Sequence, residues 1–222
     1  MGQKVNPTSW RLKVNETWKS RWFASNNYAE LLHQDLRIRK FLREEYSQAS
    51  IADIEIDRDA NKITVTIKTA RPGVIIGRGG AGASKIKESI EKLVKGSKVK
   101  VNIEEVKNPD ANARVVAENI SSQLERRMPF RRAMKQSIEK ASQAGVKGIK
   151  VQISGRLNGA EIARSEKAIS GLVPLSSIKS RIDYAYVAAK TTFGIIGIKV
   201  WIYKGDLVDK TLPNNINKPL GK

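Results

Sequence analysis

A glycine-rich loop, Gly77-Arg78-Gly79-Gly80, lies between an alternating apolar run and an amphipathic helical pattern in this chain of 222 residues. Glycines lack a Cβ atom, so the main chain of such a loop can approach a ligand closely. The N-terminus of the helix that follows offers free backbone N–H groups, which bind phosphate. Residues 60–87 around the loop contain six Lys or Arg residues and no Asp or Glu. The combination predicts contact with a phosphate backbone.

The sequence on both sides of the loop predicts a compact α+β unit over residues 28–107. Apolar residues recur at helical spacing before and after the loop, and alternating apolar residues indicate strands. In chain order the predicted elements are a helix at 28–46, strands at 52–56 and 63–67, the loop, a helix at 86–94 and a strand at 99–103. The two strands before the loop are close enough to form a β-hairpin.

The loop has two competing interpretations as a binding motif. Gly77–Gly82 satisfies the dinucleotide-binding pattern G-x-G-x-x-G, and Glu104 follows about twenty residues later, as that fold requires. Against this interpretation, Arg71-Pro72 interrupts the preceding strand, and a hairpin implies antiparallel rather than parallel pairing. A glycine-rich turn without any ligand is a third possibility.

The second interpretation is a KH domain, in which a Gly-x-x-Gly loop between two helices clamps a single-stranded backbone. Val74–Gly80 resembles the KH signature, and the order of elements resembles the type II variant. The signature has a bulky aliphatic residue where this chain has Ala83, so we expect either looser helix packing or a replacement contact from Ile86.

A second α+β domain is predicted for residues 108–206. Asn108-Pro109 combines a capping residue with proline, which is typical of a helix start. Apolar patterns then predict two helices packed on a mixed or antiparallel four-stranded sheet. The helices are expected from 108 to about 127 and from 129 to 144, and the strands near 149–153, 164–169, 183–192 and 195–203.

Segments at the two ends complete the expected organisation. Residues 1–27 form a basic, aromatic arm in which Trp10, Trp18 and Trp22 alternate with Lys and Arg residues. These tryptophans could stack on bases, but we expect them to dock the arm onto the body, because tryptophan is buried on average. Residues 207–222 are asparagine-rich with few apolar residues and are predicted to be a flexible tail.

The composition narrows the classes of partner and chemistry. The formal charge is +19, from 41 basic and 22 acidic residues, and nucleic acid is therefore the leading partner, ahead of an anionic membrane. No run of 18 apolar residues suggests a membrane span, and we expect an intracellular protein. With no cysteine and His33 as the single histidine, we expect no metal site, no cofactor and no catalytic residues.

A second basic site is predicted at the start of the helix that follows Pro129. Five cations and no acid occur between Arg126 and Lys135. At helical spacing Arg131, Arg132 and Lys135 share one exposed side, because Phe130, Met134 and Ile138 face inward. Like charges on one face repel one another, and a bound polyanion relieves that repulsion. Arginine suits phosphate because its planar guanidinium donates two hydrogen bonds at once.

Several segments resemble the bacterial-type small-subunit ribosomal protein S-three family. They are Met1–Pro7, the glycine-rich loop, Phe130–Lys135, Gly148–Leu157, Gly159–Arg164 and Gly194–Ile202. The resemblance extends to about Asp206. It implies a non-enzymatic constituent of the small-subunit head that binds small-subunit (16S-type) rRNA and lines the mRNA entrance tunnel, where a basic helix face holds and helps to unwind incoming mRNA.

The resemblance also implies roles for individual residues and partners. Arg131, Arg132 and Lys135, with Arg127 beside them, would contact mRNA, whereas the implied rRNA contacts are Lys4, Arg11, Arg156 and Arg164. Implied neighbours are the small-subunit proteins of families ten and fourteen in the head and families four and five at the tunnel, in a cytoplasmic or organellar ribosome. The alternatives are a free-standing KH RNA-binding regulator and a dinucleotide-binding enzyme.

Overall fold

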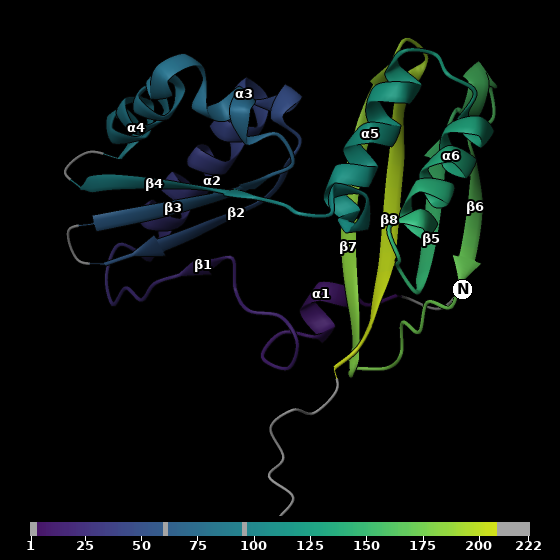
Figure 1. Ribbon diagram of the computed structural model, residues 1–222, viewed down its shortest axis with the longest axis horizontal. Coiled ribbons are helices and arrows are strands. Elements are labelled where there is room, and N and C mark those ends of the chain that lie inside the picture. Colours follow the sequence, from purple (N-terminus) through teal and green to yellow (C-terminus); the bar gives the residue numbers. More distant parts are fainter. Residues whose placement is uncertain (1–3, 60–61, 95–96, 208–222) are drawn as a thin grey trace, which may run out of the picture.

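Two four-stranded β-sheets, each packed against α-helices, form the two halves of the computed structural model (Figure 1). The structure describes residues 4–59, 62–94 and 97–207. The predicted flexible tail therefore lies outside the described residues, except for Leu207. The architecture confirms the expected α+β class.

The first half contains the predicted helix, hairpin, loop, helix and strand in that order, with a further short helix before the loop that the apolar pattern did not predict. Strands β2 and β3 form the antiparallel hairpin, and β4 pairs parallel to β3 after the two helices that flank the loop. The sheet has the order β1-β2-β3-β4. The bounds are β1 (Ser20–Arg21), α2 (Tyr28–Glu45), η1 (Ser47–Ala49), β2 (Ile51–Arg58), β3 (Lys62–Thr69), α3 (Pro72–Ile76), η2 (Arg78–Gly80), α4 (Ala81–Leu93) and β4 (Lys98–Glu105).

The core of this half joins the helical stripes to the inward face of the sheet. Ile38 and Leu42 of α2 are fully buried against Ile86 and Ile90 of α4 and the isoleucines of the hairpin. Ala83 is only half buried. Ile86, one turn later, is fully buried in this core, as expected if it replaces the apolar contact of the KH signature.

The second half has two helices on an antiparallel sheet with the strand order β6-β5-β8-β7. Inward residues of β5 and β8, such as Val151 and Val200, are fully buried beneath helix residues that include Phe130. The antiparallel pairing of all four strands decides between the mixed and the antiparallel sheet that the sequence had left open. The bounds are η3 (Pro109–Ala111), α5 (Ala113–Glu125), α6 (Phe130–Gln143), β5 (Gly148–Gly155), η4 (Leu157–Gly159), β6 (Arg164–Gly171), β7 (Ser180–Thr191) and β8 (Gly194–Asp206).

The start of α5 differs from the prediction. Pro109 opens only a short 3-10 turn, and the helix begins at Ala113. Asn112 is the capping residue, because its side-chain oxygen accepts hydrogen bonds from the backbone N–H groups of Arg114 at 3.0 Å and Val115 at 3.3 Å. The Asn-Pro pair thus marks the connection between the halves rather than the helix itself.

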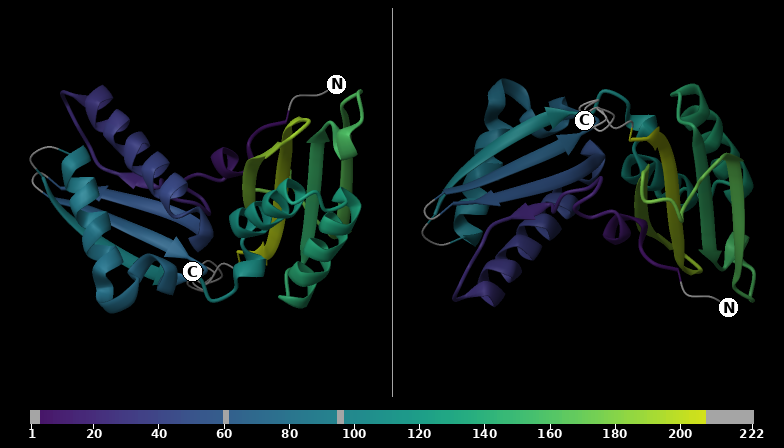
Figure 2. Two further views of the ribbon diagram at one scale, coloured as in Figure 1. Left: turned by 90° about the horizontal axis from the view of Figure 1, so that it is seen from above. Right: turned by 90° about the horizontal axis from the view of Figure 1, so that it is seen from below.

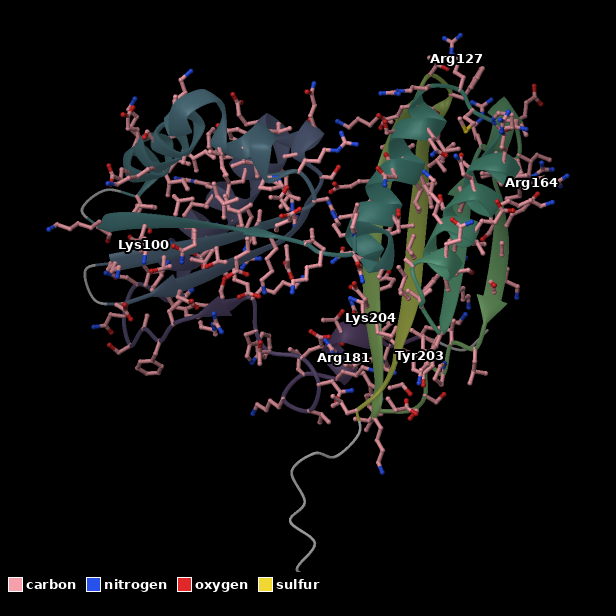
Figure 3. All side chains as sticks on the ribbon, in the orientation of Figure 1. Lys100, Arg127, Arg164, Arg181, Tyr203 and Lys204 are labelled. Atoms are coloured by element: carbon pink, nitrogen blue, oxygen red, sulfur yellow. The ribbon has the colours of Figure 1, made fainter. Side chains whose placement is uncertain are left out.

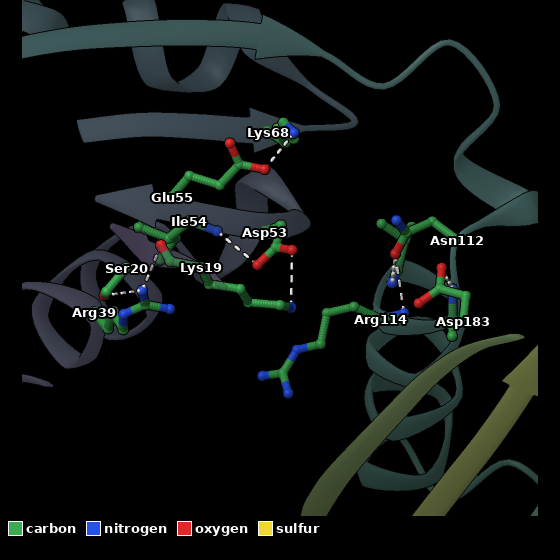
Figure 4. Close-up of polar contacts among 12 residues, drawn as sticks. Lys19, Ser20, Arg39, Asp53, Ile54, Glu55, Lys68, Asn112, Arg114 and Asp183 are labelled. Carbon is green, nitrogen blue, oxygen red and sulfur yellow. Dashed lines mark hydrogen bonds and ion pairs between the residues drawn. The ribbon is translucent and has the colours of Figure 1, made fainter. Parts of the chain in front are cut away.

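The N-terminal arm runs along both halves. Helix α1 (Pro7–Trp10) lies against β7, and β1 adds a short parallel strand to the edge of the first sheet beside β2 (Figure 1). Ion pairs hold this strand: Lys19 contacts Asp53 at 2.8 Å, and Arg21 binds Asp57 through two hydrogen bonds of 2.7 and 2.9 Å. Figure 4 shows the Lys19–Asp53 pair on the sheet face, together with the cross-strand pair formed by Glu55 and Lys68.

The tryptophans of the arm fulfil the docking prediction only in part. Trp22 is half buried, packs against Tyr28 and donates its indole N–H to Asp35 at 2.9 Å. Trp10 and Trp18 are 49% and 61% exposed, so docking by these two side chains was wrongly predicted. The arm is held mainly by polar groups instead.

A buried carboxylate connects the arm to the first half. Asp35 of α2 forms an ion pair with Arg58 at 2.5 Å, and both side chains are nearly inaccessible to solvent. Its second oxygen accepts hydrogen bonds from Ser20 and Trp22 of the arm. Because a buried charge is tolerated only when it is paired and hydrogen-bonded, this cluster fixes the arm, α2 and β2 together.

Candidate nucleic-acid interface

The turn between α5 and α6 places an arginine in an unusual backbone conformation. Arg127 has a φ of +61°, its N–H donates to the Leu124 carbonyl, and the Met128 N–H donates to the Gln123 carbonyl. This is the hydrogen-bond pattern of a Schellman helix end, where the left-handed position is usually glycine. Holding an exposed arginine at positive φ costs conformational free energy. Backbone strain of this kind is common at functional sites. The predicted mRNA contact Arg127 is therefore displayed at the helix junction.

Helix α6 brings the three predicted mRNA contacts together. Arg131, Arg132 and Lys135 are exposed and line a shallow depression of about 550 Å³ with Gln136 and Glu139. The opposite side of the helix holds Phe130, Ala133 and Met134 in the core, as the sequence periodicity predicted. The acidic Glu139 at the rim was not considered in the sequence prediction.

Contacts to neighbouring elements orient the Arg131 side chain. Its guanidinium lies 5.6 Å from the centre of the Phe130 ring, and its Nη2 lies 3.3 Å from Oε1 of Glu166 on strand β6. Arg164 contacts the same Glu166 oxygen at 3.6 Å. Figure 3 shows Arg127 at the end of α5 and Arg164 on the outer strand β6. Arg131 and the predicted rRNA contact Arg164 are thus linked through one carboxylate.

The glycine-rich loop joins two helices rather than a strand and a helix. It turns with positive φ angles at Gly77, Gly79 and Gly80, and α4 begins directly after it with no side-chain cap. A Cβ on Gly82 would lie 2.2 Å from the Ile75 carbonyl oxygen, so close packing of α3 on α4 requires glycine there. Since the dinucleotide motif must follow a strand directly, that interpretation is wrong. A loop between two helices is the arrangement expected for a KH domain.

One predicted rRNA contact is not available to RNA. Arg11 is completely buried and donates hydrogen bonds to backbone carbonyls of its own chain. The acceptors lie at residues 7, 174, 175, 177 and 180, at 2.7–3.4 Å. Burial lowers the pKa of this guanidinium. All five N–H donors of an arginine can be used in this way, so Arg11 holds the arm against the β6–β7 connection instead of binding a partner.

The remaining predicted rRNA contacts lie on the surface of the second half. Arg156 is exposed and donates to the carbonyls of Ala160 at 2.9 Å and Phe193 at 3.4 Å, so it also supports the turn after β5. Lys4 is exposed at the start of the described chain. The structure does not bring these residues onto the α6 face.

A polar cleft of about 1070 Å³ between the two halves was missed by the sequence prediction. Its basic lining comes from helices α2, α5 and α6, from strand β7 and from the connections before α3 and after α5. These segments are distant in sequence, so no local pattern could indicate the cleft. Burial and the nearby charges of Arg114 and Arg39 lower the pKa of Arg43 on its wall. The basic lining residues are Arg43, Arg71, Arg114, Arg126, Lys140 and Lys190, and the acidic ones are Asp110, Glu118 and Glu125.

Two kinds of feature are absent from the described part of the chain. Within residues 4–59, 62–94 and 97–207, no three His, Cys, Asp or Glu side chains are grouped so that they could hold a metal ion. None of the described helices has the length and apolar character needed to cross a membrane.

Comparison with known proteins identifies two family matches and many full-length relatives. The model of the KH domain matches residues 37–111, and the model of ribosomal protein S3, C-terminal domain, matches residues 120–202. The chain is similar to small ribosomal subunit protein uS3 of Nitratiruptor sp., with 51% identity over 99% of this chain and 96% of the relative. The protein of the same name from Exiguobacterium sibiricum is 50% identical over 94% and 95%, and that from Streptococcus mutans is 48% identical over the whole of both chains.

Proposed function

The chain belongs to the small ribosomal subunit protein uS3 family, and we propose that its α6 face holds incoming mRNA at the entrance tunnel of the subunit. As a member of this family the chain is a structural constituent of the small ribosomal subunit. Its relatives are named as ribosomal proteins, which supports the expectation of a non-enzymatic role.

The observation that carries the proposal is the shared depression lined by Arg131, Arg132 and Lys135. The three side chains come from two successive turns of a rigid helix, so their charges are presented together to one strand. Phosphate contacts of this kind hold a single strand without reading its sequence. Translocation of the mRNA is driven elsewhere in the ribosome. The α6 face binds the mRNA as it arrives and thereby keeps it single-stranded.

The other basic sites supply the proposed rRNA contacts. The KH loop at Gly77–Gly80, which leads into the uncapped start of α4, and the exposed cations Lys4, Arg156 and Arg164 would bind the 16S-type rRNA through its phosphates. The proposed neighbours in the head are the proteins of families ten and fourteen, and those at the tunnel are families four and five. We propose that the boundary between the two domains lies at residue 108. We also propose that the protein belongs to cytoplasmic ribosomes.

Crosslinking in assembled subunits tests the mRNA contact. Subunits are reconstituted with the wild-type chain or with the Arg131→Ala, Arg132→Ala, Lys135→Ala variant and bound to mRNA that carries 4-thiouridine at the nucleotides entering the tunnel, on the 3′ side of the decoded codon. The proposal predicts crosslinks to α6 peptides in the wild type and their loss in the variant. Equal crosslinking in both, with normal co-sedimentation of both chains, would exclude the α6 face as a messenger contact.

The salt dependence of RNA binding gives an independent measure of the number of phosphate contacts made by the α6 face. For the purified chain and a single-stranded RNA, removing three phosphate contacts should lower the slope of log affinity against log salt by about 2, since each contact contributes about 0.7. An unchanged slope would show that the three cations do not meet phosphate.

A further inference from the structure

The second sheet has a face that carries no helical layer. Both α5 and α6 lie on the same face of this sheet (Figure 2). On the opposite face, Val173 and Leu175 of the β6–β7 connection cover one end, where they pack with Trp201 and Tyr203. The remainder of this face is exposed or half buried, and its residues have no role in the function proposed above.

One cross-strand row of this face combines lysine with an aromatic ring. The register pairs Lys167 of β6 with Gln152 of β5, Gln152 with Lys199 of β8, and Lys199 with Tyr186 of β7. Directly paired residues on one face are neighbours, and strands lie about 4.8 Å apart, so the row is about 14 Å long. Lys167 and Lys199 are exposed.

The aromatic ring in this row lies against the sheet. Gly197 has no side chain, and a Cβ there would lie 3.4 Å from Cε2 of Tyr186. The glycine therefore leaves room for the ring to rest on the backbone of β8. Tyr186 is nevertheless 51% exposed, which leaves the outer part of the ring accessible. An exposed aromatic ring fixed on a sheet is a surface on which a base can stack.

The next row adds a third lysine. Lys150 of β5 is paired with Ile169 and Trp201, and its ammonium lies 5.0 Å from the centre of the Trp201 ring. Burial, and then the charges of Lys4 and Lys167, lower the pKa of Lys150, so the lysines lie close enough to repel one another.

No carboxylate neutralises this group of lysines. The row on the other side consists of Ser165, Ser154, Gly197 and Ala188, so the three rows contain no Asp or Glu. Among the described residues, Lys150, Lys167 and Lys199 form no ion pair. Uncompensated positive charge on a folded surface favours a polyanion.

We propose that this open sheet face binds a single-stranded segment of RNA, with phosphates at Lys150, Lys167 and Lys199 and a base stacked on Tyr186. Lysines alone would suit any acidic partner. The exposed ring in the same row favours nucleic acid, because alternating phosphates and planar bases match alternating cations and an aromatic surface. The site lies on a different face of the second half from α6 and does not depend on the function proposed for α6.

The test uses the full chain with the α6 cations already removed. In the Arg131→Ala, Arg132→Ala, Lys135→Ala background, binding of a fluorescein-labelled 12-nucleotide oligouridylate is followed by anisotropy. Tyr186→Ala should weaken binding by roughly fivefold or more, the range for loss of one stacked base, whereas Tyr186→Phe keeps the ring and should bind like the background chain. Replacing Lys150, Lys167 and Lys199 with Gln should lower the salt slope by about 2.

A matched control and a second readout separate the outcomes. Lys40→Gln removes one lysine that is paired with Glu44 on α2 and should leave affinity within the error of the assay. Circular dichroism establishes that each variant is folded. Unchanged affinity in Tyr186→Ala and an unchanged slope in the lysine variant would overturn the proposal. If those variants bind RNA normally but fail to enter the subunit, the face contacts a protein, and the proposal is equally overturned.

Discussion

Replacing Arg11 with alanine tests how the N-terminal arm is held to the second half. The guanidinium donates to backbone carbonyls of Pro7, Ser177 and Ser180 and to two further carbonyls in the β6–β7 connection, the shortest at 2.7 Å. Hydrogen bonds from a charged donor contribute about 1.5–3 kcal/mol each, but the cost of burying the cation offsets part of the sum, and water can reach some of the freed carbonyls. We expect a loss of about 3–4 kcal/mol in the free energy of unfolding.

Two further variants calibrate this value. Arg11→Lys supplies at most three donors for five acceptors, so about half of the loss is expected. Arg181→Ala removes an exposed arginine from the neighbouring strand β7 and should change stability by less than about 0.5 kcal/mol. Urea unfolding is followed by tryptophan fluorescence, to which Trp10, Trp18 and Trp22 of the arm and the buried Trp201 of the second half contribute. A loss below about 1 kcal/mol for Arg11→Ala would refute the assignment of Arg11 as the anchor of the arm.

Three other changes probe the helix junction, the buried ion pair and the α6 face. Arg127→Gly should raise stability by about 1 kcal/mol, because glycine adopts positive φ without strain, while weakening RNA binding; a lower melting temperature would contradict this. Asp35→Ala leaves the buried Arg58 unpaired and should cost about 3–5 kcal/mol by urea unfolding, whereas a loss under 1 kcal/mol would show that the pair is dispensable. Glu166→Gln releases Arg131 from its ion pair and should strengthen RNA binding about twofold by anisotropy, and weaker binding would mean that Glu166 positions Arg131 productively.

Elements with strong local patterns could be predicted from the sequence. The alternation in β5 and the periodicity of α6 identified their buried faces correctly, because burial of one face decides both patterns. The α6 site followed from the same reasoning, since residues three and four apart on a helix share a side. The position of the glycine loop between two helices followed only from its resemblance to the KH signature, since the local pattern predicted no helix at Pro72–Ile76.

Features that depend on distant contacts could not be predicted. Arg11 is buried by carbonyls 163 to 169 positions away, so its sequence neighbourhood resembles an exposed basic arm. Strand β1 has only two residues and forms because Lys19 and Arg21 meet carboxylates of β2. The row of lysines and tyrosine on the second sheet can be recognised only when the register of its four strands is known. No local sequence pattern gives that register.

Translation through a structured messenger tests the central claim most directly. Ribosomes with Arg131→Ala, Arg132→Ala and Lys135→Ala are compared with wild type on matched templates with and without a hairpin. The control variant carries Lys40→Ala, Lys87→Ala and Lys92→Ala, which removes the same net charge from α2 and α4. If the α6 face holds incoming mRNA, only the first variant slows on the hairpin template, while both keep normal rates on the unstructured one. Equal rates for that variant and the wild type on the hairpin template would contradict the account.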